Sequence, residues 1–394
     1  MKVTALAPHT PEAVRAALAA RGWESQQAWF AATGVEPLIV LIEEITEAER
    51  EALVHWGARA GTDVLTGDSG SGTLGWALVA GSASRIAPLA RPDRAPAELA
   101  GLVQPLGRLL AAHADPPRTW TIRNGEINLE HPVIIGILNV TPDSFSDGGQ
   151  FSSIEAAVEH GARLAAQGAH LLDVGGESTR PGAAPVPVDE EIARVVPVVD
   201  KLAKRHIGPI SVDTRKAAVA RAALDAGAAV INDVSGLGFD PELAGLVVES
   251  KAGVILMHMR GSPAIMDSLA QYQDVAVDVA AELAAVAERA ERAGIAHECI
   301  VLDPGFGFAK TAEHNFRLLD ELATIVGVGY PVAVGLSRKR FLGAATGRPV
   351  EDRDRATAVA CALAWERGAR LFRVHDVGLT REALTLASAT TNPT

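Results

Sequence analysis

Short apolar runs alternate with amphipathic stretches over most of the chain, from Val133 onward. Each run is too short for a helix and ends in polar residues, which is typical of strands buried on both faces of a parallel sheet. The predicted strands are Val133–Leu138, His170–Val174, Pro209–Val212, Ala229–Asp233, Gly253–Met257, Ile300–Leu302, Pro331–Gly335 and Leu371–Val374. The predicted helices are Ile154–Gln167, Val188–Lys204, Lys216–Ala226, Pro241–Ser250, Val275–Ala293, Ala312–Leu322, Asp352–Arg367 and Arg381–Ala389.

This succession of eight strand–helix units predicts an α/β protein with a (β/α)8 TIM barrel. A doubly wound open sheet is the alternative, but it usually has about five or six strands and so fits less well. In a barrel, the active residues are expected where the strands end and the following loops begin.

Residues 1–118 differ in composition from the rest of the chain, because most of the tryptophans lie there. We therefore expect a smaller N-terminal α/β domain of unknown role. Its predicted helices are Pro11–Arg21, Glu47–Ala60 and Pro96–Ala112, and its predicted strands are Pro37–Ile42, Asp63–Thr66 and Thr73–Val79. Thr46 and Glu49 form a capping box before the second helix. The boundary is placed between Ala114 and Thr119. The barrel domain then spans 119–394, and Asn124-Gly125 predicts an opening hairpin over 119–130.

Net charge, apolar runs and cysteine content argue against several classes of partner and location. The 394 residues carry a formal net charge of −12, which argues against nucleic acid or an anionic membrane as a partner. We find no apolar run long enough to cross a bilayer and no signal peptide, so a cytoplasmic protein is expected. Cys299 and Cys361 are the only cysteines and are expected to be buried and unreactive. An anionic substrate would require positive charge concentrated at its site.

A polar or charged residue follows every predicted strand. The strand exits are Asn139, Asp173–Gly182, Ser211–Thr214, Asn232–Asp233, His258–Arg260, Asp303–Lys310, Ser337–Lys339 and Arg373–Asp376. A single such residue has a structural explanation, for example Asp213 as a helix cap or His375 as a core histidine. Eight polar strand exits at the same end of a barrel have no such structural explanation, because barrel stability does not require buried charge at one end only.

The side chains at these strand exits form two groups, one acidic or amide and one cationic. Asp213, Asn232 and Asp303 suit a flat heterocycle that presents ring N–H and amino donors. The cations could hold a phosphate or diphosphate, and they are Arg180, Lys339, Arg373 and, when protonated, His375. Asn139 could complete a Mg²⁺ shell filled mainly by water and phosphate oxygens. A donor-bearing ring beside a phosphate-like anion suggests transfer of a group activated by that leaving group.

Seven motifs together resemble the dihydropteroate synthase family, over about Asn128 to the carboxyl terminus. They are GILNVTPDSFSDGG at 136–149, DVGGESTRPG at 173–182, SVDT at 211–214, INDV at 231–234, DPGFGF at 303–308, SRK at 337–339 and RVHDV at 373–377. The resemblance implies a Mg²⁺-dependent condensation of (7,8-dihydropterin-6-yl)methyl diphosphate with 4-aminobenzoate, giving 7,8-dihydropteroate and diphosphate. A dissociative route, without a covalent protein nucleophile, is chemically reasonable.

The resemblance also implies roles for individual residues. The residues similar to the family's pterin pocket are Asp213, Asn232, Asp303 and Lys339, and those similar to its diphosphate–magnesium site are Asn139, Arg373 and His375. The residues that would shape the aminobenzoate pocket or its lid are Phe145, Thr179, Arg180, Pro181, Phe308 and Lys339. Asp147 would face the developing pterin cation. The expected catalytic set is Asp147, Arg180, Lys339, Arg373 and His375. Arg340 stands where many relatives carry a small serine.

Two other functions remain open at this point. A pterin-dependent methyltransferase would hold a similar ring, but it is expected to lack the loops at 141–149 and 177–182 and has no use for a diphosphate site. A catalytically inactive barrel retained as a binding protein should have lost one of Asn139, Arg180, Lys339 or Arg373, and all four are present. The resemblance implies small-molecule substrates as partners and a homodimer formed through the last barrel helices.

Overall fold

The computed structural model describes residues 2–6, 38–68, 74–114, 116–140, 150–178, 185–262 and 265–391. The chain divides into two compact units. The first comprises Met1–Pro116 with Asp274–Ala281 and Asp320–Tyr330, and the second comprises Pro117–Gln273, Glu282–Leu319 and Pro331–Thr394. The expected helix Pro11–Arg21 lies outside the described residues.

The first unit is built on an antiparallel sheet with strand order β1-β2-β4-β3. Its strands are β1 (Lys2–Leu6), β2 (Leu38–Thr46), β3 (Asp63–Asp68) and β4 (Leu74–Gly81), and its helices include α3 (Glu47–Ala60), α4 (Ala83–Ile86) and α5 (Ala100–Ala114). The capping box predicted for Thr46 and Glu49 is present at the start of α3. One core joins the buried faces of α3 and α5 to the sheet through Leu53, Trp56 and Leu106.

The second unit is a parallel barrel of eight strands, as the sequence predicts. The strands are β7 (Val133–Asn139), β8 (Leu171–Gly175), β9 (Ile210–Asp213), β10 (Val230–Asp233), β11 (Gly253–Met257), β12 (Ile300–Asp303), β13 (Ala333–Val334) and β14 (Leu371–Val374). Neighbouring strands pair in parallel around the order β12-β11-β10-β9-β8-β7-β14-β13. A parallel bridge between Leu302 and Val332 closes the ring.

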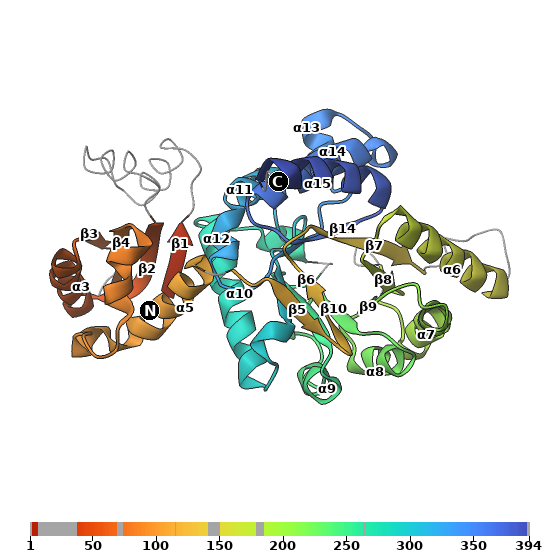
Figure 1. The fold of residues 1–394 in the computed structure, drawn as a ribbon, viewed down its shortest axis with the longest axis horizontal. Helices are drawn as coiled ribbons and strands as arrows, with labels where there is room; N and C mark the ends of the chain where they lie inside the picture. Colours follow the sequence, from red (N-terminus) through yellow and green to blue (C-terminus); the bar gives the residue numbers. More distant parts are fainter. Residues whose placement is uncertain are drawn as a thin grey trace. The chain divides into compact units, whose positions relative to one another are not determined.

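Helices surround the barrel strands in the order of a (β/α)8 fold (Figure 1). They are α6 (Gln150–Gln167), α7 (Val188–Lys204), α8 (Ala217–Asp225), α9 (Leu243–Ser250), α10 (Val275–Arg292), α11 (Ala312–Asp320), α13 (Arg340–Thr346), α14 (Asp354–Glu366) and α15 (Val377–Thr391). The short helix α12 (Leu322–Val326) belongs to the first unit. The stretch expected as one helix at 312–322 is divided between α11 and α12, and α13 had no predicted counterpart.

The hairpin β5 (Thr119–Ile122) and β6 (Gly125–Asn128) packs under the amino ends of the barrel strands. Asn124 has a φ of 68°, as its Asn-Gly turn requires. Trp120 is fully buried, and its Nε1 donates to the carbonyl of Cys299 at 2.9 Å. A Cβ at Gly253 would lie 2.8 Å from the side chain of Ile122, so this position needs glycine. The opposite, carboxyl end of the barrel is therefore the end left for chemistry.

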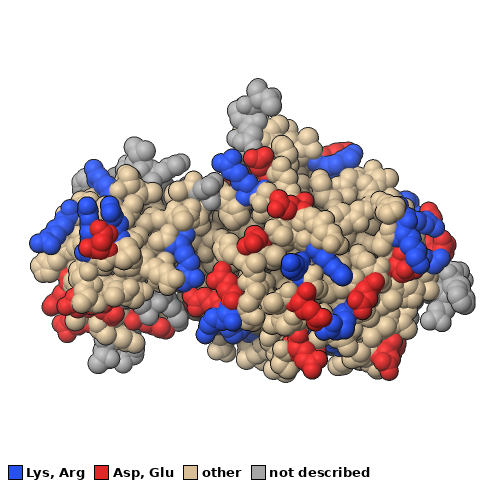
Figure 2. Space-filling view, turned by 60° about the horizontal axis from the view of Figure 1, so that its bottom comes forward, with Lys and Arg blue, Asp and Glu red and all other residues tan. Residues whose placement is uncertain are grey.

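Charge on the surface is mixed. Figure 2 shows acidic and basic side chains in small groups of both signs on one face of the molecule. None of the described helices is long and apolar enough to span a membrane. Cys299 and Cys361 are free and buried, as expected from the sequence.

Candidate active site

The polar residues at the strand exits form a layer inside the barrel because side chains alternate along each strand. An inward-facing apolar residue near the amino end is followed two positions later by an inward-facing polar one. The pairs are Leu171 and Asp173, Val230 and Asn232, Val301 and Asp303, and Leu371 and Arg373. The apolar members belong to the core above the hairpin. The polar members need partners, because charge buried in a barrel is costly unless it is paired.

Asp173 is the centre of this polar layer and is fully buried. Its Oδ2 accepts hydrogen bonds from Arg373 Nε at 2.6 Å and from Asn232 Nδ2 at 3.0 Å. Within the described parts of the chain its other oxygen, Oδ1, has no hydrogen-bond partner. A buried carboxylate oxygen without a donor is unfavourable, so it is suited to receive a donor from a bound molecule. Sequence reasoning noted Asp173 at a strand exit but gave it no role.

Arg373 joins Asp173 to a second carboxylate, because its Nη2 donates to Asp213 Oδ2 at 2.8 Å. Burial raises the pKa of Asp213 to about 7; the charge of Arg373 opposes this rise, and that of Asp173 adds to it. Burial alone would lower the pKa of Arg373, but the two carboxylates outweigh it and raise that pKa above its ordinary value. The guanidinium therefore stays charged, while Asp213 can carry a proton near neutral pH.

Asp303 and Lys339 lie at the sixth and seventh strand exits, and each influences the charge of the other. Asp303 Oδ1 accepts from the backbone N–H of Gly305 at 2.7 Å, and burial raises the pKa of this carboxyl. Burial also lowers the pKa of Lys339 to about 8, against the attraction of Asp303. The Lys339 ammonium lies 4.3 Å from the ring centroid of Phe308, a cation–π distance. A Cβ at Gly307 would lie 3.1 Å from Lys339 Cδ, so the lysine stem passes closely over this glycine.

His375 is held by Ser337, from the neighbouring strand exit. The backbone N–H of His375 donates to Ser337 Oγ at 3.2 Å, and the same hydroxyl lies 2.9 Å from His375 Nδ1. A serine hydroxyl has one proton and two lone pairs, so Oγ can accept from the backbone and also either donate to Nδ1 or accept from Nδ1–H. Ser337 thus fixes the orientation of the ring.

Asn139 ends β7 beside Gly175, with which it pairs in the sheet. A Cβ built on Gly175 would lie 3.6 Å from Asp213 Oδ2 and 3.8 Å from Asn139 Oδ1. The missing side chain at Gly175 therefore leaves room between an amide oxygen and a carboxylate. Among the described residues no group of three His, Cys, Asp or Glu side chains could hold a metal ion by itself. A neutral amide oxygen fits Mg²⁺ only as a single protein ligand among water and phosphate oxygens.

The described residues on either side of the second loop are tied together by Lys216. Its ammonium bonds the carboxylates of Glu177 and Glu191 and donates to the carbonyl of Val186 at 2.6 Å. The backbone N–H of Val186 in turn donates to Glu177 Oε2 at 3.3 Å. Glu177 and Val186 are thereby fixed to the start of α8.

Of the predicted site residues, Asp213, Asn232 and Arg373 lie in one hydrogen-bonded network through Asp173, and Lys339 lies with Asp303 and Phe308. Asn139 ends the first strand of the barrel, and His375 directly follows the eighth. The remaining predicted residues lie outside the described residues: Phe145, Asp147, Thr179, Arg180 and Pro181. Arg340, at the expected rim, is exposed and pairs with Asp267 at 3.5 Å.

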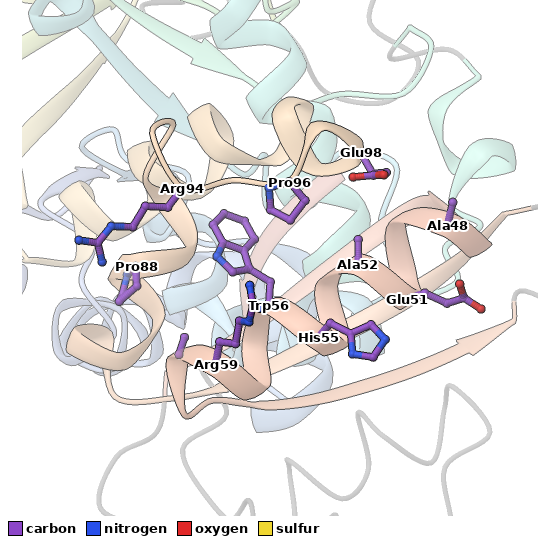
Figure 3. Close-up of a pocket in the computed structure, with 11 residues that line it drawn as sticks. Ala48, Glu51, Ala52, His55, Trp56, Arg59, Pro88, Arg94, Pro96 and Glu98 are labelled. Atoms are coloured by element: carbon purple, nitrogen blue, oxygen red, sulfur yellow. The ribbon is translucent and has the colours of Figure 1, made fainter.

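A groove of about 550 Å³ in the first unit is lined by none of these residues. It lies along α3 and the segment 88–98, with the indole of Trp56 at its centre. Figure 3 shows the charged ends of Arg94 and Glu51 directed to opposite sides of that indole rather than toward a common point. The groove therefore lacks the convergent polar groups present at the end of the barrel.

Comparison with known proteins finds relatives that cover the barrel. Residues 135–375 match the sequence family described as pterin binding enzyme. The chain is 48% identical over 263 residues to the dihydropteroate synthase of Mycobacterium leprae, a match that covers 65% of this chain and 92% of the relative.

Solved structures of the same family are similar to the barrel. Xanthomonas albilineans dihydropteroate synthase with 4-aminobenzoic acid superposes with a TM-score of 0.66 at 46% identity, covering 70% of this chain and 98% of that one. The same bacterial enzyme in complex with 7,8-dihydropteroate gives a TM-score of 0.63 at 44% identity, with coverage of 69% and 98%.

Proposed function

Because the chain belongs to the dihydropteroate synthase family of transferases, we propose that its barrel condenses (7,8-dihydropterin-6-yl)methyl diphosphate with 4-aminobenzoate. The C–O bond to diphosphate breaks, a C–N bond to the aryl amine forms, and the amine loses one proton. The products are 7,8-dihydropteroate and diphosphate. The observation that carries this proposal is the buried network in which Arg373 links Asp173 to Asp213, with Lys339 held over the Phe308 ring.

The acceptors of the network suit the pterin ring. Asp213, Asn232 and Asp303 are all buried inside the barrel and present carboxylate or amide groups. The ring N–H and amino groups of a pterin are donors, and the unpartnered Oδ1 of Asp173 is a further acceptor for them. In a site without bulk water these hydrogen bonds discriminate strongly against rings that lack the donors.

The cations suit the diphosphate. Nε and Nη2 of Arg373 donate to Asp173 and Asp213, and Nη1 is proposed to donate to the leaving group. His375, whose ring Ser337 orients, is proposed to add a second donor to the diphosphate. Because the charge on diphosphate grows as the C–O bond breaks, fixed donors and cations stabilise the transition state more than the bound substrate. Arg180 and Asp147, on the two loops, are proposed to act on the leaving group and on the pterin cation.

We propose that Asn139 supplies one oxygen to a Mg²⁺ ion, with diphosphate and water as the other ligands. When bound, the ion neutralises part of the charge on the departing diphosphate. Lys339 and Phe308 are proposed to bound the 4-aminobenzoate site together with the loop residues Phe145, Thr179 and Pro181. The cation–π contact between Lys339 and Phe308 orients both groups.

The protein is also proposed to form a homodimer through its last two long helices. Large apolar side chains are exposed on both: Val359 (60% exposed) on α14 and Leu386 (70% exposed) on α15. Exposed apolar residues gathered on neighbouring helices favour an isologous contact between copies. Light scattering after size exclusion should give twice the mass of the chain, and Leu386→Glu should reduce it. We further propose a cytoplasmic location, which fractionation of the source cells would test.

One assay tests the proposed reaction. The purified full chain is mixed with dihydropterin diphosphate, Mg²⁺ and 4-aminobenzoate, and diphosphate release and dihydropteroate formation are both measured. Release that requires 4-aminobenzoate and matches product formation supports the proposal. Methyl transfer to or from a folate, without any diphosphate release, would instead favour the methyltransferase alternative. Binding of pterin without turnover would favour an inactive barrel.

A further inference from the structure

Lys310 is a buried lysine that the proposed chemistry does not use. It is 5% exposed and follows the DPGFGF segment that leaves β12. Its ammonium lies within hydrogen-bond distance of three acceptors: the carbonyls of Gly305 at 3.2 Å and Phe308 at 3.1 Å, and His258 Nδ1 at 2.9 Å. An ammonium has three donors, so each N–H has one partner. The loop is folded around this nitrogen.

The backbone of the loop needs such support. Gly305, Gly307 and Ala309 all have positive φ, at 67°, 78° and 49°. A Cβ at Gly305 would lie 2.1 Å from the carbonyl oxygen of His258, so the loop passes directly against the end of β11. Left-handed backbone of this kind persists only where the surroundings fix it. Lys310 supplies donors to two carbonyls that the loop's own geometry turns inward.

His258 fixes Lys310 in turn. Burial, with the charge of Lys310, lowers the pKa of His258 to about 4, so the ring is neutral. Its Nδ1 then accepts from Lys310, and its Nε2 donates to Glu282 Oε2 at 2.8 Å. Glu282 is held on α10 by Arg260, whose Nε lies 3.0 Å from Oε1. The chain of contacts runs from Lys310 through a neutral imidazole to a paired carboxylate.

Two groups of the proposed site depend on this loop. Gly305, whose carbonyl accepts from Lys310, donates its N–H to Asp303 Oδ1 at 2.7 Å. Phe308, whose carbonyl also accepts from Lys310, places its ring 4.3 Å from the Lys339 ammonium. Lys310 is thus linked to the proposed pterin acceptor Asp303 through Gly305. It is linked to the Lys339 cation through Phe308.

We infer that Lys310 is a positioning residue, held by His258, that sets the DPGFGF loop so that Asp303 and Lys339 meet the pterin substrate. The inference rests on the proposed function for its substrate, but its test does not depend on turnover. It assigns Lys310 no contact with the reacting atoms.

The first test is Lys310→Met, which keeps the length of the stem and removes the ammonium. Binding of 6-hydroxymethylpterin to the full chain is measured by calorimetry and is expected to weaken about tenfold or more, since small misplacements of positioned groups cost up to about a hundredfold. In turnover, KM for the pterin substrate should rise and kcat should fall. Wild-type pterin affinity and kinetics in a folded Lys310→Met protein would overturn the inference.

A matched pair at His258 separates positioning from simple loss of stability. The amide of His258→Gln can accept from Lys310 and donate to Glu282, whereas His258→Leu can do neither. His258→Gln should retain pterin affinity within about threefold of wild type, and His258→Leu should resemble Lys310→Met. Equal affinities in the two variants at matched melting temperatures would overturn the inference. If the wild type binds pterin but does not turn over, the proposed function fails and the binding comparison still tests Lys310.

Discussion

Arg373 and Asp173 form a buried ion pair, with Arg373 Nε 2.6 Å from Asp173 Oδ2, and this pair is the point at which the polar layer of the barrel is joined together. Asp173 also accepts from Asn232, and Arg373 also donates to Asp213. The Asp173 carboxylate therefore holds side chains from two other strands, β10 and β14, and Arg373 extends the network to a third, β9. Its second oxygen has no partner among the described residues, so under the proposed function Asp173 would accept from the pterin while it orients the Arg373 guanidinium.

Asp173→Asn should disrupt the hydrogen-bonded network that joins Asp173, Arg373 and Asn232. The amide carries no charge to balance Arg373, and one end of it donates where the carboxylate accepted, so Arg373 and Asn232 lose their common partner. We expect kcat/KM to fall about a hundredfold and unfolding to cost about 3 kcal/mol less. Asp200→Asn is the control, because within the described part of the chain Asp200 forms an exposed pair with Lys204 on α7 and lies outside the polar network of the barrel. Equal kinetics for the two variants would remove Asp173 from the site.

Lys339→Ala and Arg373→Ala should each abolish measurable turnover, because each removes a cation that the leaving group or the pterin requires. Circular dichroism should show an intact fold in both. Arg373→Ala should melt at the lower temperature, since it leaves Asp173 and Asp213 without their shared cation. Retention of near-wild-type rates by either variant would contradict the assigned site.

The dependence of kcat/KM on pH should show an alkaline limb from Lys339. Its pKa is lowered to about 8 by burial, which Asp303 opposes and Arg373 assists. The cation is present below that pH and is lost as pH rises through it, so kcat/KM should fall about tenfold per pH unit above it. Lys339→Arg, which stays charged, should have a lower rate but no such limb. A profile that is flat up to pH 10 in the wild type would contradict a role for the lysine cation.

The fold could be predicted because its signal is local. Each of the eight strands is an apolar run closed by a polar exit, and every one of them is present in the barrel. Some elements gave no such signal, among them β1, α4 and α13. β1 (Lys2–Leu6) mixes polar and apolar residues and is recognised only by its pairing with β2, and α13 (Arg340–Thr346) starts within a basic segment. The strand expected over Pro331–Gly335 is reduced to Ala333–Val334.

The site was predictable only in part. Position at a strand exit identified Asp213, Asp303 and Arg373, because parallel strands bring their carboxyl ends to one edge. Which of these residues pair with one another depends on depth within the barrel and on side-chain reach, which a single sequence does not contain. For that reason the roles of Asp173 and Lys310 emerged only from the structure, although the two-residue alternation from Leu171 already placed Asp173 inside.

Mg²⁺ dependence should be sensitive to Asn139. If its amide oxygen is the one protein ligand, Asn139→Ala should raise the Mg²⁺ concentration needed for half-maximal activity about tenfold, while saturating Mg²⁺ restores much of kcat. A chelator should stop turnover in both proteins. Asn128→Ala, in the hairpin at the other end of the barrel, is the control and should leave the Mg²⁺ titration unchanged. An unchanged titration for Asn139→Ala would show that the ion is held elsewhere.

Removal of residues 1–118 should affect stability more than chemistry. Every described residue of the proposed site lies after Thr119, so a protein that starts there should keep kcat within about threefold of the full chain.

The first unit, however, includes Asp274–Ala281, and Val277 lies in its hydrophobic cluster with Ile39 and Leu41. Truncation exposes Val277 and should lower the melting temperature by about 5 °C. Calorimetry and the diphosphate assay measure the two effects separately. A truncated protein that is folded but more than about tenfold slower would mean that the N-terminal unit takes part in catalysis.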